Sequence, residues 1–582
     1  MQAVHNNRLQ LTYPFTGLML ISSFINGGKM KLPFGTLASR KNNKLYWLLG
    51  FMLFYILSVI THLSYFPLNG DEPRRAIVSL EMLHSGNFIR PTTMGWEYYN
   101  KPPVYNWFIA LCMKLTNSSS ELAVRLPSLI SLLVWGYCNY VIVKKILSPA
   151  IAALSSVFLV TSFDIYFWGL SNGGEIDVFY SLIVYLQVMS LFYYNLKRKW
   201  TALFVASYAF CAIGLLTKGF PSILFQGFTL LALCVFNKSP RLLFRWQHIL
   251  GLAGFFAIAG GFFYTYSFHG NAGNYLADLL KESFNKSAFG ENADKLVKKV
   301  IEYPGSFFKI LLPWSLLLLL LFKKHRFRLW QNPVVRFCFL FIIFNIGPYW
   351  FTGHPRMRYA YMFLPFCMII LAYIFYQFKE EYPALITKIF KYLVLFFVVV
   401  LIAIITTAFF AAVNYVWLSI AALLLLFYIL LYNKLRQYAV WYFAGGIVVL
   451  RFAYALVFIP VKYDKTKLRY DHEMAAIAAA NNFQPVSIYK KPDQLDLIID
   501  LKVTKLNLGT IPAIPYMAYQ MPYYYYRSSG QLITYDTVLL ANKNYIGFGS
   551  DLKGLAIDTL YSFKDYNQND EEVMLFRKKA DK

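Results

Sequence analysis

An acidic pair, Asp71 and Glu72, directly follows an apolar run, and cations follow the pair in the same polar segment: Arg74, Arg75 and Lys101. A carboxylate can accept the proton of an incoming nucleophile, and nearby cations can hold a phosphate leaving group as its negative charge grows. The same residues also suit the start of a helix, because Asp71 is a good N-cap and Pro73 fits a first turn. The segment is therefore a candidate reactive site, with helix capping as its structural alternative.

A second acid, Asp177, opens an apolar run in the sequence Gly173-Gly174-Glu175-Ile176-Asp177. A carboxylate at the edge of hydrocarbon is costly to maintain without a partner, so Asp177 is a functional candidate. Glu175 has less apolar flanks, and we interpret it as a solvated loop residue.

Further cations stand in short polar stretches between apolar runs. Lys218 is the one cation in Leu216-Thr217-Lys218-Gly219-Phe220-Pro221, and Arg356 and Arg358 follow His354. Both groups have structural alternatives, because lysine stems snorkel along apolar surface and arginines attract the phosphates of lipid headgroups.

Taken together, these residues fit the transfer of a sugar from a polyprenyl phosphate to an acceptor. Asp71 would be the base that accepts the acceptor's proton. Cations would hold the carrier phosphate: Arg74, Lys101 and Lys218. A divalent metal ion between Asp71, Glu72 and Asp177 also fits the charges, although no spacing signature demands one.

The elements that must position these residues lie in a membrane. The chain has 582 residues, 58% of them hydrophobic and 15% charged, and long apolar runs recur from Lys44 to Pro460. Hydrocarbon about 30 Å thick requires about 20 apolar residues per helix. The net charge of +27 comes from small clusters at the ends of these runs. We therefore expect membrane lipids as partners and no nucleic acid.

The apolar runs predict a polytopic α-helical membrane protein with thirteen transmembrane helices, beginning near residues 45, 126, 148, 176, 201, 221, 248, 307, 334, 359, 389, 416 and 438. Every second connection is basic, for example Lys197 to Lys199 and Lys323 to Arg328. The positive-inside rule assigns these connections and the basic N-terminal segment to the cytoplasm. An odd number of spans then puts the C-terminus on the outer face.

We predict three parts: a cytoplasmic segment over 1–44, a transmembrane domain over 45–460 and an outer-face domain over 461–582. Two outer loops are too long to be simple connections: 66–125 and 269–306. Within the first outer loop, Pro73 to Leu83 suits a short helix starting at Asp71, and Val104 to Leu115 is apolar but too short to span. Both stretches predict interfacial helices.

The C-terminal segment is polar and mixed, which predicts a small α/β domain. A helix is expected over Leu468 to Asn482 and strands over three runs: Val486 to Lys490, Gln531 to Leu540 and Val573 to Arg577. The aromatic run from Tyr523 to Tyr526 could stack on sugars or headgroups, with packing inside the domain as the structural interpretation.

The six cysteines stand singly in apolar stretches, which argues against disulfides and structural zinc. The stretch from Leu18 to Ile25 resembles a signal-peptide core, but it lacks a basic region before it and a cleavage site after it. Met30 is followed by a cleaner basic lead and could be the start of the protein.

Four ordered motifs resemble one family: Asn69-Gly70-Asp71-Glu72-Pro73-Arg74-Arg75-Ala76, Glu81-Met82-Leu83-His84-Ser85-Gly86-Asn87-Phe88, Tyr98-Tyr99-Asn100-Lys101-Pro102-Pro103 and Ala123-Val124-Arg125-Leu126-Pro127-Ser128. They are similar to the bacterial lipid A aminoarabinose transferases (ArnT-like proteins) and related protein O-mannosyltransferases, which are GT-C membrane glycosyltransferases. Further similar stretches extend over the membrane domain: Leu215 to Gly219, Leu312 to Trp314 and Arg358 to Pro365.

The resemblance implies the GT-C fold, Asp71 as the principal catalytic acid and Asp177 as the second acidic position. It also implies that Arg74 and Lys101 bind the carrier phosphate and that Tyr98 lies beside the site. The predicted catalytic residues are Asp71, Asp177 and Glu72, and the predicted carrier- and sugar-binding residues are Arg74, Lys101, Tyr98, Lys218 and Arg358.

The sequence departs from the family at two places. Asn100 stands where the family has an acid before Lys-Pro-Pro, and the stretch from Glu282 to Lys286 lacks the His and Arg expected in the aminoarabinose enzymes. These differences bear on the sugar and the acceptor more than on the reaction class.

The leading hypothesis is an inverting transferase of the bacterial inner membrane. It would move a sugar from undecaprenyl phosphate to lipid A or another glycan or protein acceptor at the periplasmic face. A protein O-glycosyltransferase of the same superfamily is an alternative that differs only in its acceptor. A transporter or flippase of lipid-linked sugars is a second alternative, although transporters place coupling residues near the midplane, whereas these candidates cluster on one face.

Overall fold

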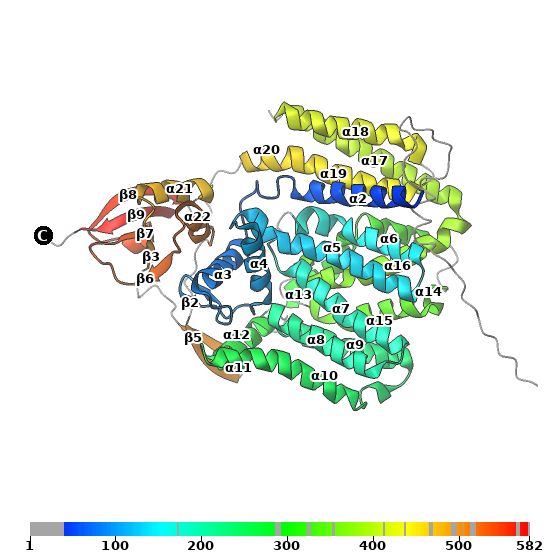
Figure 1. Ribbon diagram of the computed structural model, residues 1–582, viewed down its shortest axis with the longest axis horizontal. Helices are drawn as coiled ribbons and strands as arrows, with labels where there is room; N and C mark the ends of the chain where they lie inside the picture. The colour runs from blue at the N-terminus through cyan, green and yellow to red at the C-terminus, as the bar shows by residue number, and fades with distance from the viewer. Residues whose placement is uncertain are drawn as a thin grey trace, which may run out of the picture.

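The computed structural model describes residues 40–170, 174–285, 293–322, 328–351, 356–410, 414–435, 438–464, 469–490, 498–503, 506–512, 519–565 and 571–579. The signal-like stretch, Met30, Gly173, Lys286 and His354 lie outside the described residues. Long helices run side by side through most of the molecule, and a small mixed domain is attached at one end (Figure 1).

Helices form the membrane part: α2 (Arg40–Ile60), α5 (Glu121–Ile146), α6 (Pro149–Val160), η1 (Asp164–Gly169), α7 (Asp177–Leu196), α8 (Trp200–Lys218), α9 (Pro221–Asn237), η2 (Pro240–Leu242), α10 (Gln247–Phe255), η3 (Phe256–Gly260), α11 (Gly261–Ser267), η4 (Trp314–Phe322), α14 (Arg328–Gln331), α15 (Pro333–Trp350), η5 (Met357–Phe363), α16 (Leu364–Glu381), α17 (Pro383–Phe410), α18 (Tyr415–Leu435), α19 (Ala439–Ala453), η7 (Tyr454–Phe458) and α20 (Ile459–Asp464).

The described part of the chain contains nine helices long and apolar enough to cross a membrane. A tenth span exists if Val300–Ile310 and Trp314–Leu320, which meet at an angle of 104°, count as one. Shorter apolar helices lie at three further positions: Gly50–Ile60, Pro149–Val160 and Pro221–Asn237. A helix therefore stands at each of the thirteen predicted starts. The eighth is bent rather than straight, at a break that contains Pro313, since proline cannot continue a helical hydrogen-bond ladder.

Both long loops that the sequence assigns to the outer face are largely helical. The first contains α3 (Glu72–Ser85), β1 (Thr92–Thr93), β2 (Trp96–Glu97) and α4 (Val104–Thr116), and the second contains α12 (Ala272–Asn285) and much of α13 (Ala293–Ile310). The two helices predicted in the first loop are confirmed. The amide of Asn106 on α4 donates to the carbonyl of Arg75 on α3 over 3.0 Å, which joins the two helices.

The C-terminal part contains both helices and strands: α21 (Tyr470–Ala480), β3 (Ser487–Tyr489), β4 (Ile498–Val503), β5 (Leu506–Pro512), α22 (Gln520–Ser529), β6 (Thr534–Asp536), β7 (Asn544–Phe548), α23 (Gly549–Leu552), β8 (Ile557–Asp565) and β9 (Glu571–Lys578). Five strands form one sheet in the order β6-β3-β7-β9-β8, with β3 parallel to β6 and β7 and the remaining pairs antiparallel. The predicted helix and three strands are present, whereas β4, β5, β7 and β8 were not predicted.

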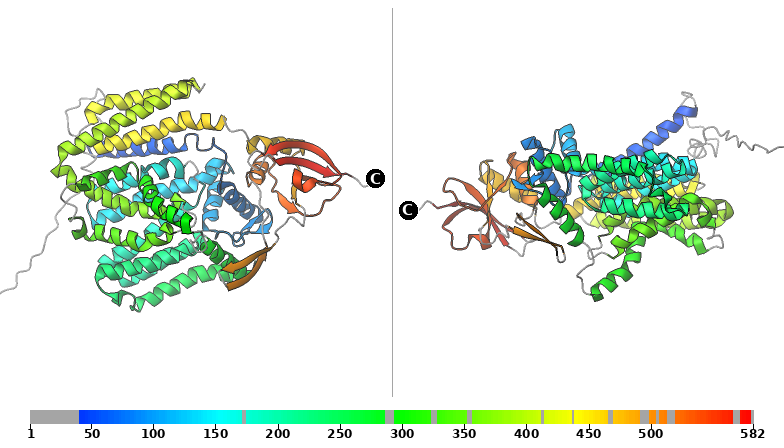
Figure 2. Two further views of the ribbon diagram at one scale, coloured as in Figure 1. Left: turned by 180° about the vertical axis from the view of Figure 1, so that it is seen from behind. Right: turned by 90° about the horizontal axis from the view of Figure 1, so that it is seen from below.

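The aromatic run of α22 joins this domain to the first outer loop. Tyr523 donates to the carbonyl of Ser119 over 2.7 Å, and the hydroxyl of Tyr524 accepts from the amide of Leu68 over 2.8 Å. Both tyrosines are buried, so packing is the correct interpretation of the run. In both views of Figure 2 the domain lies next to the outer-loop helices.

Buried polar contacts fix the helices that carry the site. Gln187 of α7 donates to Gln226 of α9 over 2.9 Å, and Gln226 donates to Ser207 of α8 over the same distance. A Cβ on Gly214 of α8 would lie 2.4 Å from the Ser222 hydroxyl of α9, so only glycine permits this close approach. Helices α7 and α8 are thereby both fixed against α9.

Candidate active site

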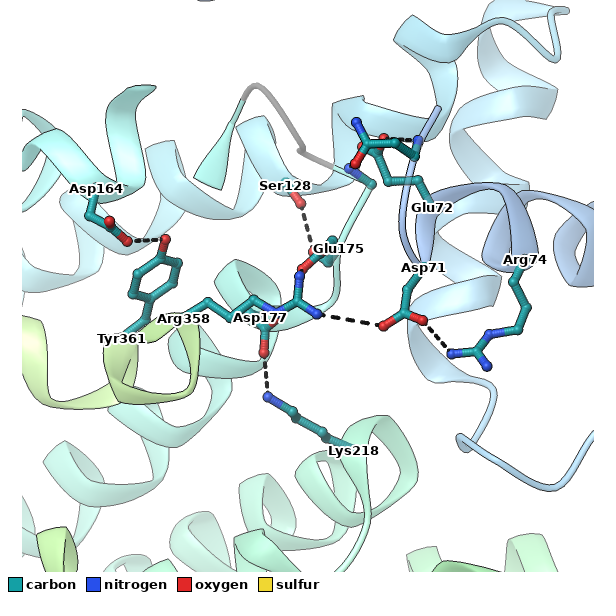
Figure 3. A network of polar contacts seen from close by, with 12 residues as sticks. Asp71, Glu72, Arg74, Ser128, Asp164, Glu175, Asp177, Lys218, Arg358 and Tyr361 are labelled. Carbon is teal, nitrogen blue, oxygen red and sulfur yellow. Dashed lines mark hydrogen bonds and ion pairs between the residues drawn. The ribbon is translucent and has the colours of Figure 1, made fainter. Parts of the chain in front are cut away.

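Asp71 lies in the turn that begins α3, and its side chain does not cap the helix. One oxygen accepts from Arg74 over 2.6 Å, and the other lies 3.6 Å from Arg358, which comes from η5 far along the chain. Figure 3 shows the carboxylate between these two guanidinium groups. Capping therefore does not account for Asp71.

The ion pairs determine the acidity of Asp71. Burial raises its pKa, but the positive charges of Arg74, Arg75, Arg358 and Lys101 outweigh burial and lower the pKa to about 2. The group is ionised at neutral pH and, with these cations in place, is only weakly basic.

Glu72 has a different environment from its neighbour. Its fully buried carboxylate accepts from Nε of Arg125 over 3.0 Å and from the terminal nitrogen over 2.8 Å. The amides of Asn69 and Gly174 donate to the same carboxylate over 3.0 and 2.7 Å. The Asn69 contact closes the turn before α3, and the other contacts hold this turn against α5 and the residues before α7. Glu72 points away from Asp71 (Figure 3).

Asp177 and Glu175 flank the start of α7. Asp177 is 4% exposed and forms an ion pair with Lys218, and its second oxygen lies 3.3 Å from Nε of Arg358. Glu175 forms an ion pair with Arg358, and its side chain is 12% exposed. The interpretation of Glu175 as a solvated loop residue was therefore wrong, since it is a partly buried member of the cluster.

Lys218 ends α8 and points inward rather than toward the membrane surface. Its ammonium group pairs with Asp177 and lies 5.1 Å from the ring centre of Tyr180 and 4.4 Å from that of Tyr359. The two aromatic rings stabilise the ammonium group in addition to its ion pair with Asp177. The snorkelling alternative does not hold.

Arg358 is the centre of the cluster. Its guanidinium group contacts three carboxylates, those of Asp71, Glu175 and Asp177. It is positioned by the short helix η5, which packs against α7. One cation thus links the first outer loop to the start of α7.

Lys101 brings the second outer loop to the site. It is nearly buried, donates to the carbonyl of Asn100 over 3.0 Å and forms an ion pair with Glu282 of α12. The hydroxyl of Tyr275, also on α12, donates to the carbonyl of Lys101 over 2.9 Å. Glu282, which the sequence singled out only as a departure from the family, therefore contacts a predicted phosphate ligand.

Aromatic rings support Arg74. Its guanidinium carbon lies 5.8 Å from the ring centre of Tyr98 and 5.6 Å from that of Tyr519, which directly precedes α22. Tyr98 is 2% exposed and packs against Val78 and Met82. Tyr98 thus lies behind Arg74 rather than in the pocket lining.

The cluster surrounds a cavity of about 310 Å³, which we call the Asp71 pocket. Ten charged residues line it, six cationic and four anionic: Arg74, Arg75, Lys101, Lys218, Arg356 and Arg358, and Asp71, Glu175, Asp177 and Glu282. The excess of positive charge suits an anionic ligand.

The predicted metal site does not assemble. Glu72 is held by Arg125, and Asp71 and Asp177 both face Arg358, which occupies the position a cation would take between them. Among the described residues, no group of three or more His, Cys, Asp or Glu side chains is arranged to hold a metal ion. The donor set of Asp71, Glu72 and Asp177 is therefore incorrect.

Two ionisable residues near the candidate site were not singled out in the sequence, although their positions in the sequence could have revealed them. Arg125 and Asp164 are single ionisable residues inside otherwise apolar stretches, where a charge requires a partner. The side chain of Arg125 is fully buried on Glu72, and Asp164 accepts from Tyr361 over 2.5 Å. Glu282 had no such signal, because it lies in a polar segment.

These features define a membrane-embedded helical fold with an acid- and cation-lined pocket at one end. The same fold is found in the crystal structure of ArnT from Cupriavidus metallidurans bound to undecaprenyl phosphate, with a TM-score of 0.63 and 16% identity over 91% of this chain and 98% of that one. The chain therefore has the GT-C fold that the sequence predicted.

Sequence comparisons agree with this assignment over part of the chain. Residues 100–262 match the family model of dolichyl-phosphate-mannose-protein mannosyltransferases. An undecaprenyl phosphate-alpha-4-amino-4-deoxy-L-arabinose arabinosyl transferase of Pseudomonas savastanoi pv. phaseolicola is 34% identical over 30% of this chain, and one of Pseudomonas fluorescens is 29% identical over the same share. The match spans about a third of the length of these curated relatives. The expected resemblance to ArnT-like proteins is confirmed.

Proposed function

We propose that this protein is a glycosyltransferase that moves a sugar from polyprenyl (undecaprenyl) phosphate to lipid A or another acceptor at the outer face of the bacterial inner membrane. The observation that carries the proposal is the Asp71 pocket, in which the carboxylate of Asp71 and three other acids lie among six cations. The relatives named above use an undecaprenyl-phosphate-linked sugar, according to their names.

The cations would bind the carrier phosphate. Arg74 and Arg358 offer planar guanidinium forks, and Lys101 and Lys218 offer compact charges in a partly dehydrated pocket. All four are paired with carboxylates in the structure, so a phosphate would exchange one set of ion pairs for another. The developing negative charge on the leaving phosphate would then be stabilised as the glycosidic bond breaks.

Asp71 would act as the base. Its low pKa makes it a poor proton acceptor while four cations surround it. A bound phosphate would attract Arg74 and Arg358, weaken their hold on Asp71 and raise its pKa toward a useful value. Proton acceptance would thus depend on the donor being in place. Inversion at the sugar carbon follows if the acceptor attacks directly.

The remaining acids would position cations. Asp177 orients Lys218 and Arg358, and Glu72 orients the turn that carries Asp71 through its pair with Arg125. We therefore propose that Glu72 is a structural residue and does not react.

Two other functions, protein O-glycosylation and transport of lipid-linked sugars, are distinguished from the proposed one by a single transfer experiment. The match to protein mannosyltransferases favours a peptide acceptor as the second candidate. A transporter of lipid-linked sugars would release no product.

The test is transfer of labelled sugar from a panel of polyprenyl-phosphate sugars, with lipid A and peptide acceptors in parallel. Wild-type protein should form product, and Asp71→Asn should lose at least about a hundredfold in rate, as expected for a general base. Asp558→Asn is the matched control, because Asp558 is an exposed acid of β8 outside the pocket. Product from Asp71→Asn at the wild-type rate would refute the base, and no product from wild-type protein with any donor would favour the transporter.

A further inference from the structure

A second cavity adjoins the Asp71 pocket. It measures about 360 Å³, and four residues line both cavities: Glu175, Asp177, Arg356 and Arg358. Asp164 and Tyr361 line only the second, which we call the Asp164 pocket. In Figure 3, Asp164 and Asp71 lie on opposite sides of Arg358. The two cavities therefore meet at this arginine.

Asp164 differs from the other acids of the cluster. Each of the four acids in the Asp71 pocket forms an ion pair: Asp71 with Arg74, Glu175 with Arg358, Asp177 with Lys218 and Glu282 with Lys101. In the part of the chain that the structure describes, Asp164 contacts only the hydroxyl of Tyr361. Arg356 and Arg358 line the same pocket as Asp164, but neither described arginine forms an ion pair with the Asp164 carboxylate. Asp164 therefore retains capacity to accept hydrogen bonds.

The surroundings of Asp164 fix its position. It begins η1, a π-helical turn, and such turns recur at functional sites. Tyr361 is 3% exposed and packs against Gly169, where an added Cβ would lie 3.3 Å from the tyrosine ring. Trp168, which is 56% exposed, lines the same pocket and offers an aromatic face. An acceptor oxygen beside an aromatic ring is a suitable arrangement for a sugar, whose hydroxyls donate and whose C–H face is apolar.

We propose that the Asp164 pocket binds the glycosyl group of the donor and that Asp164 accepts hydrogen bonds from it. This inference rests on the proposed function and deepens it, because it makes Asp164 and Tyr361 determinants of which sugar is accepted. The carrier phosphate lies in the Asp71 pocket, and Arg358 stands at the junction between phosphate and sugar. Asp164 would recognise a group on the sugar that donates hydrogen bonds, either a hydroxyl or an ammonium.

The first measurement is equilibrium binding of unglycosylated and glycosylated undecaprenyl phosphate to the full-length protein. Asp164→Asn should bind the unglycosylated carrier as wild-type protein does and should bind the glycosylated carrier about tenfold more weakly, as expected for loss of one hydrogen bond to a charged group. Thermal unfolding identifies any variant that fails to fold, and Tyr361→Phe, which removes only the hydroxyl, provides a second and smaller perturbation. Asp558→Asn is again the control.

The second measurement is transfer with two donors that differ only by an amino or a hydroxyl group on the sugar. Asp164→Asn should raise KM for the preferred donor with kcat little changed. A larger loss for the amino sugar identifies an ammonium as the group bound, and equal losses identify hydroxyls.

Three results would overturn the inference. Equal affinity of folded Asp164→Asn and wild-type protein for the glycosylated carrier would remove the sugar contact. An equal loss for the unglycosylated carrier would mean that the pocket holds the carrier itself. Wild-type protein that binds neither carrier would refute the proposed function as well, whereas the first two results leave it intact.

Discussion

Neighbouring acids in one motif lie in different environments. Asp71 faces the pocket and its cations, whereas Glu72 is fully buried against Arg125. Adjacent residues at a helix start point in directions about 100° apart, so one can face the pocket while the next faces the protein.

Replacement of Glu72 should therefore destabilise the protein. In Glu72→Gln the buried charge of Arg125 loses its partner, which typically costs about 3–5 kcal/mol. Thermal unfolding in detergent should show a clearly lower unfolding temperature for Glu72→Gln than for wild-type protein. The folded fraction of the variant should keep the wild-type kcat. Glu302→Gln is the matched control, because its pair with Lys298 is exposed and should contribute little. A stable but inactive Glu72→Gln would instead support a catalytic role.

We expect Asp278 to give the candidate site a pH dependence. Burial and the nearby charge of Glu282 raise its pKa to about 6, against the opposing effects of Lys281 and Lys101. The folded protein holds this proton more tightly than the unfolded chain, so protonation stabilises the fold as pH falls through about 6.

The same titration should affect donor binding. Protonation of Asp278 removes a negative charge near Lys101, so the glycosylated carrier, whose phosphodiester keeps its charge, should bind a few-fold more tightly below pH 6 than above it. Asp278→Asn should bind the glycosylated carrier equally tightly below and above pH 6. The measurement is Kd across the titration, and a pH dependence that persists in the variant would assign it to another group.

At the scale of elements, helix α22 fastens the C-terminal domain to the first outer loop. Its tyrosines contact the loop backbone on both sides of α3 and α4, and Tyr519 lies beside Arg74. The domain thus contributes to the position of a predicted phosphate ligand.

Removal of one hydroxyl should loosen this attachment. Tyr524→Phe leaves the buried amide of Leu68 without its acceptor, at a cost of about 1–3 kcal/mol. Limited proteolysis should release the C-terminal domain faster than from wild-type protein. Tyr561→Phe, whose hydroxyl contacts Glu473 within the domain, should leave that rate unchanged. Equal release from all three proteins would mean that other contacts hold the domain.

At the scale of the whole molecule, helix α3, whose first turn carries Asp71, lies at one end of the long helices, next to the α/β domain (Figure 1). The basic connections predict that the opposite end faces the cytoplasm. Single cysteines in a background without the six native ones can test this orientation. An impermeant maleimide should label Lys543→Cys in the C-terminal domain of cells with a permeabilised outer membrane, and it should not label Arg198→Cys between α7 and α8. The reverse pattern would invert the topology.

The sequence determined the helices and the end at which the candidate site residues lie. A run of about 20 apolar residues forms a spanning helix whatever its neighbours, since unpaired backbone groups are too costly in hydrocarbon. Asp71, Asp177, Lys218 and Arg358 each stand beside an end of such a run, so their common face followed from the order of the spans.

Only the tertiary structure decided which charges meet. Glu175 and Glu282 look like ordinary surface acids in the sequence, yet each is paired with a cation that comes from a distant segment. Glu72 looks like a second catalytic acid, yet Arg125 holds it away from the pocket. The physical reason is that an ion pair requires two side chains within about 4 Å. That distance is set by how helices far apart in the chain pack, which no local pattern of residues encodes.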